Sequence, residues 1–252
     1  MLESFVLLIV SLAANLLSAL AGGGAGLLQL PALIFLGLPF GVALATHKVA
    51  SVALGLGATL RHARQNTLEW RFTLFILACG LPGVVLGSSV ILAVPETPAR
   101  IALGLMTIAM GIYSWRNPGL GQDHSPRHRD LRGHVIGGVL LFLIGTLNGS
   151  LTSGTGLLVT LWLVRWFGLD YKRAVAYTLV LVGLFWNGAG AVTLGLLGEI
   201  RWDWLPALLI GSLVGGYLGA HLSIVKGNRF IKRAFEVVTI ATGLALIGGT
   251  IG

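Results

Sequence analysis

Long apolar stretches separated by short loops are the feature that most constrains this chain. Ten can be counted along its 252 residues, at about 5–21, 26–37, 41–60, 71–93, 98–115, 134–149, 155–167, 173–197, 203–225 and 231–251. A helix needs about 20 apolar residues to cross a bilayer. The second and seventh stretches are too short to cross alone, and we expect them to form half-length helices. The pattern predicts an all-α integral membrane protein.

The composition excludes a water-soluble domain. Hydrophobic residues make up 55% of the chain and charged residues only 10%, whereas soluble domains carry about 25% charged residues. The net charge of +8 comes from basic residues placed between the apolar stretches, so we read it as membrane topology and expect no nucleic-acid partner. No Lys or Arg precedes the first stretch, which we therefore expect to be a retained span.

A glycine-rich break precedes each short stretch. The breaks read Gly22-Gly23-Gly24-Ala25-Gly26 and Ser153-Gly154-Thr155-Gly156. Irregular backbone at membrane depth persists only where it is buried in protein or lines a wet cavity. The hydrophilic segment 116–133 divides the chain, which predicts a first transmembrane repeat over 1–115, a cytoplasmic linker over 116–133 and a second repeat over 134–252.

The two halves resemble each other in the order of their motifs. Gly24-x-Gly26-Leu27-Leu28 matches Gly154-x-Gly156-Leu157-Leu158 at an offset of 130, and Ala43-x-Ala45 matches Ala174-x-Ala176 at an offset of 131. If every stretch counts as one passage, the basic loops share one side, which predicts that they are cytoplasmic and that both termini are outside. Five passages per half is an odd number, so we expect inverted repeats, the architecture of secondary transporters.

Candidate binding residues cluster around the breaks. Free N–H groups at the start of a half-helix can cradle an anion, and glycine lets a ligand approach the backbone. Lys48 is the strongest single candidate because an ionisable residue within a span usually faces a polar cavity; the alternative is that it snorkels to the interface. The other polar candidates could instead satisfy freed backbone groups. The predicted substrate-binding residues are Gly22, Gly23, Gly24, Gly26, Gln29, Thr46, His47, Lys48, Asn148, Ser150, Thr152, Ser153, Gly154, Gly156, Trp186 and Asn187.

These motifs resemble those of a known family. The segment from Gly22 to Pro31, then Gly37-Leu38-Pro39 and Ala43-x-Ala45-Thr46, resembles the TauE/SafE family of membrane permeases, also called sulfite exporters. In the second half, the break and Gly168-Leu169 are similar to the second repeat of that family. Two positions depart from the first repeat: Leu161 stands where it has Pro31, and Tyr177 stands opposite Thr46. The resemblance implies transport of sulfur oxyanions or organosulfonates without a catalytic cofactor.

Together these observations predict a transporter of small anions in the bacterial cytoplasmic membrane, with sulfite or a related sulfur oxyanion or organosulfonate as the expected substrate. We expect no enzymatic activity, cofactor or metal, because the sequence holds no nucleophile or metal motif of the common types. The direction of transport and the coupling ion, H⁺ or Na⁺, stay open. Two other interpretations are an anion channel and a membrane subunit that docks a partner enzyme through its basic loops.

Overall fold

The computed structural model describes residues 2–65, 68–90, 96–152 and 154–248, and all regular structure in these ranges is helical. The helices of the first half are α1 (Leu2–Ala21), η1 (Ala25–Leu27), α2 (Gln29–Phe35), α3 (Phe40–His62), η2 (Ala63–Gln65), α4 (Trp70–Val90) and α5 (Glu96–Arg116). Those of the second half are α6 (Leu131–Ser150), α7 (Thr155–Arg165), α8 (Tyr171–Tyr177), the π-helix η4 (Thr178–Trp186), α9 (Asn187–Leu197), η5 (Trp202–Trp204), α10 (Leu205–Lys226) and α11 (Asn228–Gly248).

These helices coincide with the predicted apolar stretches. Within the described ranges, six helical segments are long and apolar enough to cross a membrane, and Ala25–Phe35 and Thr155–Arg165 are shorter apolar segments. The all-α membrane fold with a short helix after each glycine break is therefore confirmed. The first break leads into a single 3₁₀ turn before α2, whereas the second leads directly into α7.

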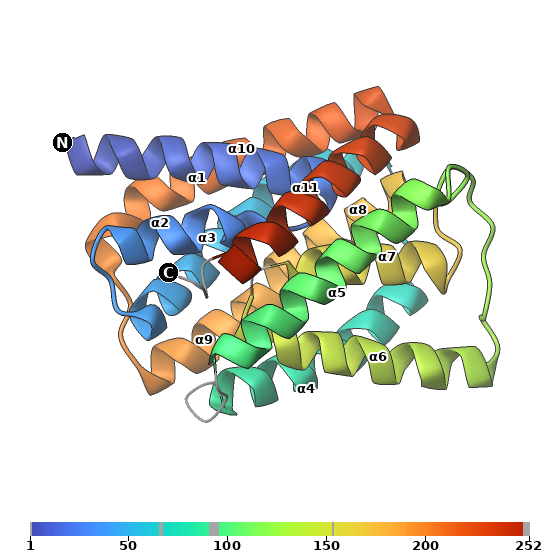
Figure 1. Ribbon diagram of the computed structural model, residues 1–252, viewed down its shortest axis with the longest axis horizontal. Helices are drawn as coiled ribbons and strands as arrows, with labels where there is room; N and C mark the ends of the chain where they lie inside the picture. Colours follow the sequence, from blue (N-terminus) through green and yellow to red (C-terminus); the bar gives the residue numbers. More distant parts are fainter. Residues whose placement is uncertain (1, 66–67, 91–95, 153, 249–252) are drawn as a thin grey trace.

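Contacts with the preceding long helices set the direction of the two short helices. Gln29 at the start of α2 donates a hydrogen bond to Ser11 in the middle of α1, at 3.1 Å. Trp166, just after α7, donates to the carbonyl oxygen of Gly133 near the start of α6, at 3.1 Å. Each short helix thus runs back beside the long helix before it, as Figure 1 shows. Each half therefore begins with a long helix followed by a short helix that runs in the opposite direction.

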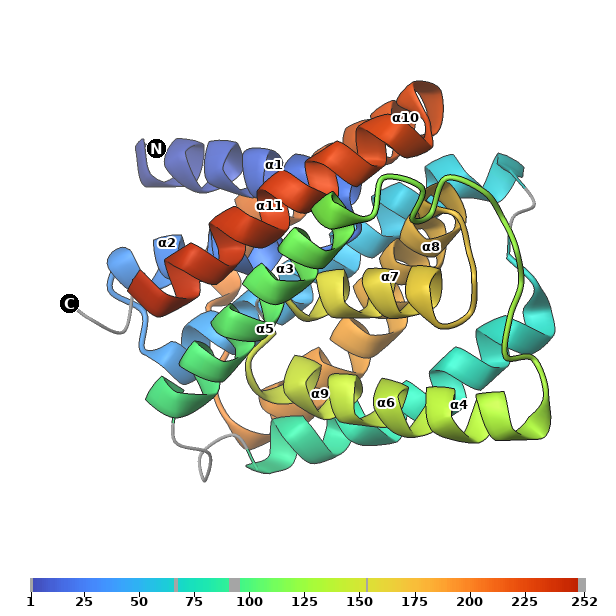
Figure 2. The same ribbon diagram turned by 45° about the vertical axis from the view of Figure 1, so that its right-hand side comes forward.

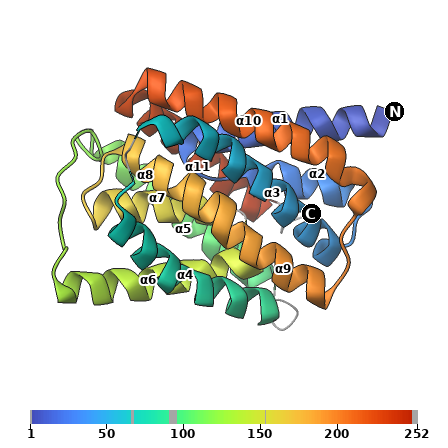
Figure 3. The same ribbon diagram turned by 180° about the vertical axis from the view of Figure 1, so that it is seen from behind.

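Helices from the two halves are interleaved. The main contacts pair α1 with α10, α4 with α6, α3 with α10 and α5 with α11, and Figures 2 and 3 show these pairs from two sides. Glycines allow the close approach: a Cβ on Gly215 of α10 would lie 2.6 Å from the Leu12 carbonyl oxygen of α1. Close backbone contact of this kind drives helix association where lipid supplies no hydrophobic force.

The linker between α5 and α6 is anchored to the protein by backbone hydrogen bonds. The backbone N–H groups of Ser125 and Arg127 donate to the carbonyl oxygens of Gly168 and Phe167 at 2.9 and 3.0 Å. The guanidinium of Arg129 lies 3.7 Å from the centroid of the Phe72 ring. Figure 2 shows the linker on one side of the molecule, whereas α1 begins and α11 ends toward the other side.

Candidate functional site

The two glycine breaks meet in direct backbone contact. Gly22, Gly23 and Gly24 adopt φ values of +81°, +144° and +102°, which disfavour any residue with a Cβ. A Cβ on Gly23 would lie 2.6 Å from the Gly156 carbonyl carbon. The Thr160 hydroxyl of α7 also donates to the Gly22 carbonyl oxygen, at 2.7 Å. This contact fixes the first break against the second.

A small cavity of about 40 Å³ lies beside this contact. It receives residues from both breaks and from the helices that pack against them. Its lining consists of Ser18, Gly23, Gly24, Ala25, Gly26, His47, Ser51, Leu54, Asn148, Thr152, Gly156, Thr178, Leu179, Val182, Gly183 and Asn187. Among these side chains within the described residues there is no carboxylate, and seven carry hydroxyl, amide or imidazole groups. The lining therefore offers hydrogen-bond donors without a negative charge.

Lys48 lies directly behind the wall of this cavity and is fully buried. Its ammonium donates to the Asn148 carbonyl and side-chain oxygens, both at 2.7 Å, and to the Asn187 side-chain oxygen at 3.1 Å. Gly190 leaves room for the lysine, since a Cβ there would lie 3.2 Å from its Cδ and Cε atoms. None of the ion pairs in the described part of the chain includes Lys48. The cation is thus held by neutral oxygens only.

Asn148 and Asn187 both direct their side-chain oxygens toward Lys48, which leaves their amide nitrogens for other partners. The Asn148 amide nitrogen donates to the Thr155 hydroxyl at 2.9 Å. The Asn187 amide nitrogen makes no hydrogen bond within the described ranges. Because the Asn187 oxygen faces Lys48 and the residue also lines the cavity, its N–H groups are available to a ligand. Gly156, at the N-terminus of α7, adds the positive end of a helix dipole.

A buried polar chain leads from the cavity toward α10. Ser51 lies 3.2 Å from Nε2 of His47, whose Nδ1 lies 2.9 Å from the Gln29 side-chain oxygen. That oxygen can only accept, so Nδ1 of His47 donates. Gln29 then donates to Ser11, which lies 2.9 Å from Ser212. The chain orients His47 and satisfies Gln29 in the protein interior.

The structure places half of the predicted site residues at the cavity. Eight line it: Gly23, Gly24, Gly26, His47, Asn148, Thr152, Gly156 and Asn187. Lys48 and Gln29 contact that lining from behind. Ser153 lies outside the described residues.

Five predicted residues do not line the cavity and have other partners. Thr46 accepts a hydrogen bond from the Arg201 backbone at 2.9 Å, and Ser150 donates to Thr146 in its own helix. Trp186 is fully buried against Gly80. Gly22 and Gly154 shape the breaks through their positive φ values. For these five residues, helix packing and backbone conformation explain the position without a ligand.

Sequence reasoning missed three polar residues of the lining, namely Ser18, Ser51 and Thr178. The repeat offset carries a signal for two of them. At an offset of 130, Ser18 corresponds to Asn148, and at 131, Thr178 corresponds to His47. Both members of each pair line the cavity. Applying the offset to the predicted residues would have identified Ser18 and Thr178.

Comparison with known proteins finds a matching family and matching relatives. The family model described as "Sulfite exporter TauE/SafE" matches residues 7–246. The chain is 30% identical over 228 residues to a "Probable membrane transporter protein" of Haemophilus influenzae, covering 90% of this chain and 88% of that one. It is 26% identical over 242 residues to the "Probable membrane transporter protein YfcA" of Escherichia coli K12, covering 96% and 88% of the two chains.

No solved structure matches the chain. The family match extends from α1 to α11, and therefore includes both breaks and every residue of the cavity lining. The relatives named above are likewise covered over most of their length. The chain belongs to the TauE/SafE family of membrane proteins.

Proposed function

We propose that this protein is a secondary transporter that moves small sulfur-containing oxyanions across the membrane, with sulfite as the leading substrate and without catalysing a reaction. The observation that carries the proposal is the position of Lys48. It is a buried cation, held only by neutral oxygens, directly behind a polar cavity between the two glycine breaks. The family description adds the sulfur chemistry of the substrate.

Charge balance supports an anionic ligand. A lysine at the centre of a membrane helix costs about 2.5–3.5 kcal/mol on insertion scales. No carboxylate in the described part of the chain offsets Lys48. An oxyanion in the cavity would compensate this charge and accept hydrogen bonds from the free amide of Asn187 and from the start of α7. In this proposal, Lys48 and the two glycine breaks bind the transported anion.

Two features support alternating access between inverted repeats. The first helix of each half packs on the fourth helical segment of the other half: α1 on α10, and α6 on α4. Positions related by the offset of 130 also share left-handed backbone, with φ of +81° at Gly22 and +59° at Thr152. A pseudo-twofold axis through the site would produce both features. Rocking of one half against the other would then open the cavity to each side in turn.

The basic loops support an orientation in the bacterial cytoplasmic membrane with both termini outside. An inside-negative potential drives an anion outward with about 2.3 kcal/mol per charge per 100 mV. Export therefore needs no coupling ion, whereas uptake would need H⁺ or Na⁺. This asymmetry favours export.

The test is uptake of radiolabelled sulfite and thiosulfate into liposomes that contain the purified protein. Gradients of pH and potential are imposed separately. Lys48→Ala is compared with Lys226→Ala, which removes an exposed lysine at the end of α10. We expect saturable flux that Lys48→Ala abolishes and Lys226→Ala leaves unchanged.

Other outcomes would overturn particular parts of the proposal. Transport by Lys48→Ala with unchanged affinity would remove the role of this residue. Flux that does not saturate would indicate a channel. Absence of flux for both anions, from protein that remains folded, would favour a membrane subunit that docks an enzyme or a different anionic substrate.

A further inference from the structure

A second polar cavity lies away from the centre of the protein. It has a volume of about 550 Å³ and is formed where α5 ends and α11 begins. Its lining is Trp115, Pro118, Gly119, Gln122, Arg229, Lys232, Arg233 and Glu236. The cavity contains three cationic side chains and one carboxylate. The charge of its lining is therefore positive.

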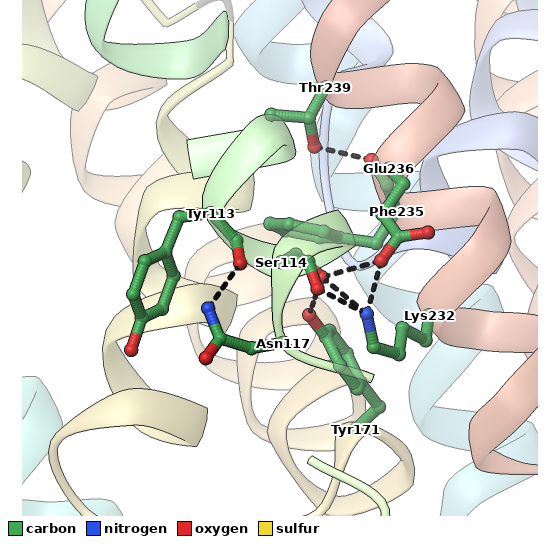
Figure 4. Close-up of polar contacts among 8 residues, drawn as sticks. All are labelled: Tyr113, Ser114, Asn117, Tyr171, Lys232, Phe235, Glu236 and Thr239. Atoms are coloured by element: carbon green, nitrogen blue, oxygen red, sulfur yellow. Dashed lines mark hydrogen bonds and ion pairs between the residues drawn. The ribbon is translucent and has the colours of Figure 1, made fainter. Parts of the chain in front are cut away.

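The carboxylate is already engaged by its neighbours. Lys232 pairs with Glu236 and donates to the carbonyl oxygen of Ser114. The Ser114 hydroxyl donates to Glu236 at 2.9 Å and lies 2.9 Å from the Tyr171 hydroxyl. Figure 4 shows the ammonium and the carboxylate directed toward Ser114 between the two helices. This buried network neutralises Lys232 and fixes the inner wall of the cavity.

Two guanidinium groups remain without a counter-charge. Arg229 and Arg233 are exposed and lie one helical turn apart on α11, so they share a face with Lys232. Neither forms an ion pair within the described residues. The same cavity is lined by Gln122, whose amide nitrogen is buried without a hydrogen-bond partner in those residues. Two free guanidinium groups and a free amide are suited to an anion with several oxygens.

The surroundings of the cavity indicate where this anion comes from. The outer faces of α5 and α11 are apolar, with Leu105 58% and Val237 69% exposed, so they face lipid. Trp115, which is 68% exposed, lies at the end of α5 where an aromatic residue anchors a helix at the interface. Basic pockets between helices at this depth bind lipid headgroups. A lipid with its acyl chains along α5 and α11 can place its phosphate at the arginines.

We propose that this cavity binds the phosphate headgroup of an anionic phospholipid, with Arg229 and Arg233 as the phosphate ligands. Lys232 holds the wall through Glu236 and Ser114, and Trp115 packs at the level of the headgroup. The bound lipid would join α5 of the first half to α11 of the second. This site does not depend on which anion the central cavity transports.

The test is native mass spectrometry of the purified full-length protein in detergent. Phosphatidylglycerol, phosphatidylcholine with identical acyl chains, or inorganic phosphate is added in turn. Arg229→Gln/Arg233→Gln is compared with Arg71→Gln/Arg132→Gln, which removes two exposed arginines elsewhere on the predicted cytoplasmic side. Size-exclusion chromatography establishes that each variant is folded.

We expect retention of phosphatidylglycerol over phosphatidylcholine by the unmodified chain and the control variant, with at least a tenfold loss of affinity in Arg229→Gln/Arg233→Gln. An equal loss in both variants would mean general attraction to surface charge and would overturn the site. Tight binding of inorganic phosphate that displaces phosphatidylglycerol would assign the cavity to a free anion. If the double variant does not fold, the single variants Arg229→Gln and Arg233→Gln are measured instead. Each should lower the affinity for phosphatidylglycerol by a smaller factor.

Discussion

At the scale of single residues, the site depends on an unusual balance around Lys48. The lysine is surrounded by amide oxygens rather than carboxylates, which keeps its charge available to a ligand. If a carboxylate stood beside it, the protein would hold its own counter-ion and would bind an external anion less well. We therefore expect anion binding to depend more on the neutral charge of Asn187 than on the shape of its side chain.

Asn187→Asp tests this expectation because aspartate has nearly the same shape. The new carboxylate would lie where an oxygen now stands 3.1 Å from the ammonium of Lys48. We expect an internal ion pair that leaves thermal stability unchanged or higher and raises the KM for the transported anion at least tenfold. Asn187→Ala is the control, since it removes the amide without adding a charge and should raise KM less. Equal KM values in the two variants would contradict the argument.

At the scale of helices, much of the architecture could be predicted because length and hydropathy reflect the bilayer directly. The extents of the long helices and the two short ones follow from the apolar stretches. Length also shows that a short helix cannot cross alone, but not whether it continues forward or turns back. That direction depends on tertiary contacts, such as Gln29 with Ser11. The nine-residue π-helix Thr178–Trp186 likewise has no periodic signal, because every residue after Thr178 is apolar or glycine.

The crossing of α3 with η4 illustrates how such contacts shape the cavity. A Cβ on Gly55 would lie 2.5 Å from the Gly183 carbonyl carbon, which is backbone and cannot move aside like a side chain. Leu54 and Gly183 both line the cavity. The distance between the two helices therefore sets part of its width.

We expect Gly55→Ala to separate α3 from η4, lower the melting temperature and reduce transport. Gly188→Ala is the matched control because it lies in the next helix along, α9, where a Cβ would meet Val52 at an ordinary 3.9 Å. Alanine in a helix is favoured over glycine by up to about 1 kcal/mol, so the control should be as stable as the unmodified chain or more. Thermal unfolding in detergent and uptake into liposomes measure both effects. Similar melting temperatures for the two variants would show that the crossing tolerates the methyl group.

At the scale of the whole molecule, the predicted sides of the loops are the same whether or not each short helix crosses the membrane. Each short helix either crosses the membrane or turns back within it beside the long helix. In both cases an odd number of crossings separates the linker from the loop after α9, so these two loops lie on opposite sides of the membrane. The two arrangements differ in where they place the glycine breaks, either at the membrane surface or within the membrane. A separate passage would expose the end of α6 outside, whereas the structure buries Ser150 and Thr152 inside the protein.

Cysteine labelling separates these arrangements, in a Cys79→Ser background that removes the single native cysteine. Ser125→Cys marks the exposed linker, Glu199→Cys the exposed loop after α9 and Ser150→Cys the buried end of α6. With a membrane-impermeant maleimide on intact cells, we expect Glu199→Cys to react and Ser125→Cys to react only after permeabilisation. Ser150→Cys should react in neither case, because the chain turns back before it reaches the outer surface.

The reverse pattern for Ser125→Cys and Glu199→Cys would invert the predicted orientation. Reaction of both from one side would mean an even number of crossings between them. Labelling of Ser150→Cys from outside would make α7 a passage of its own.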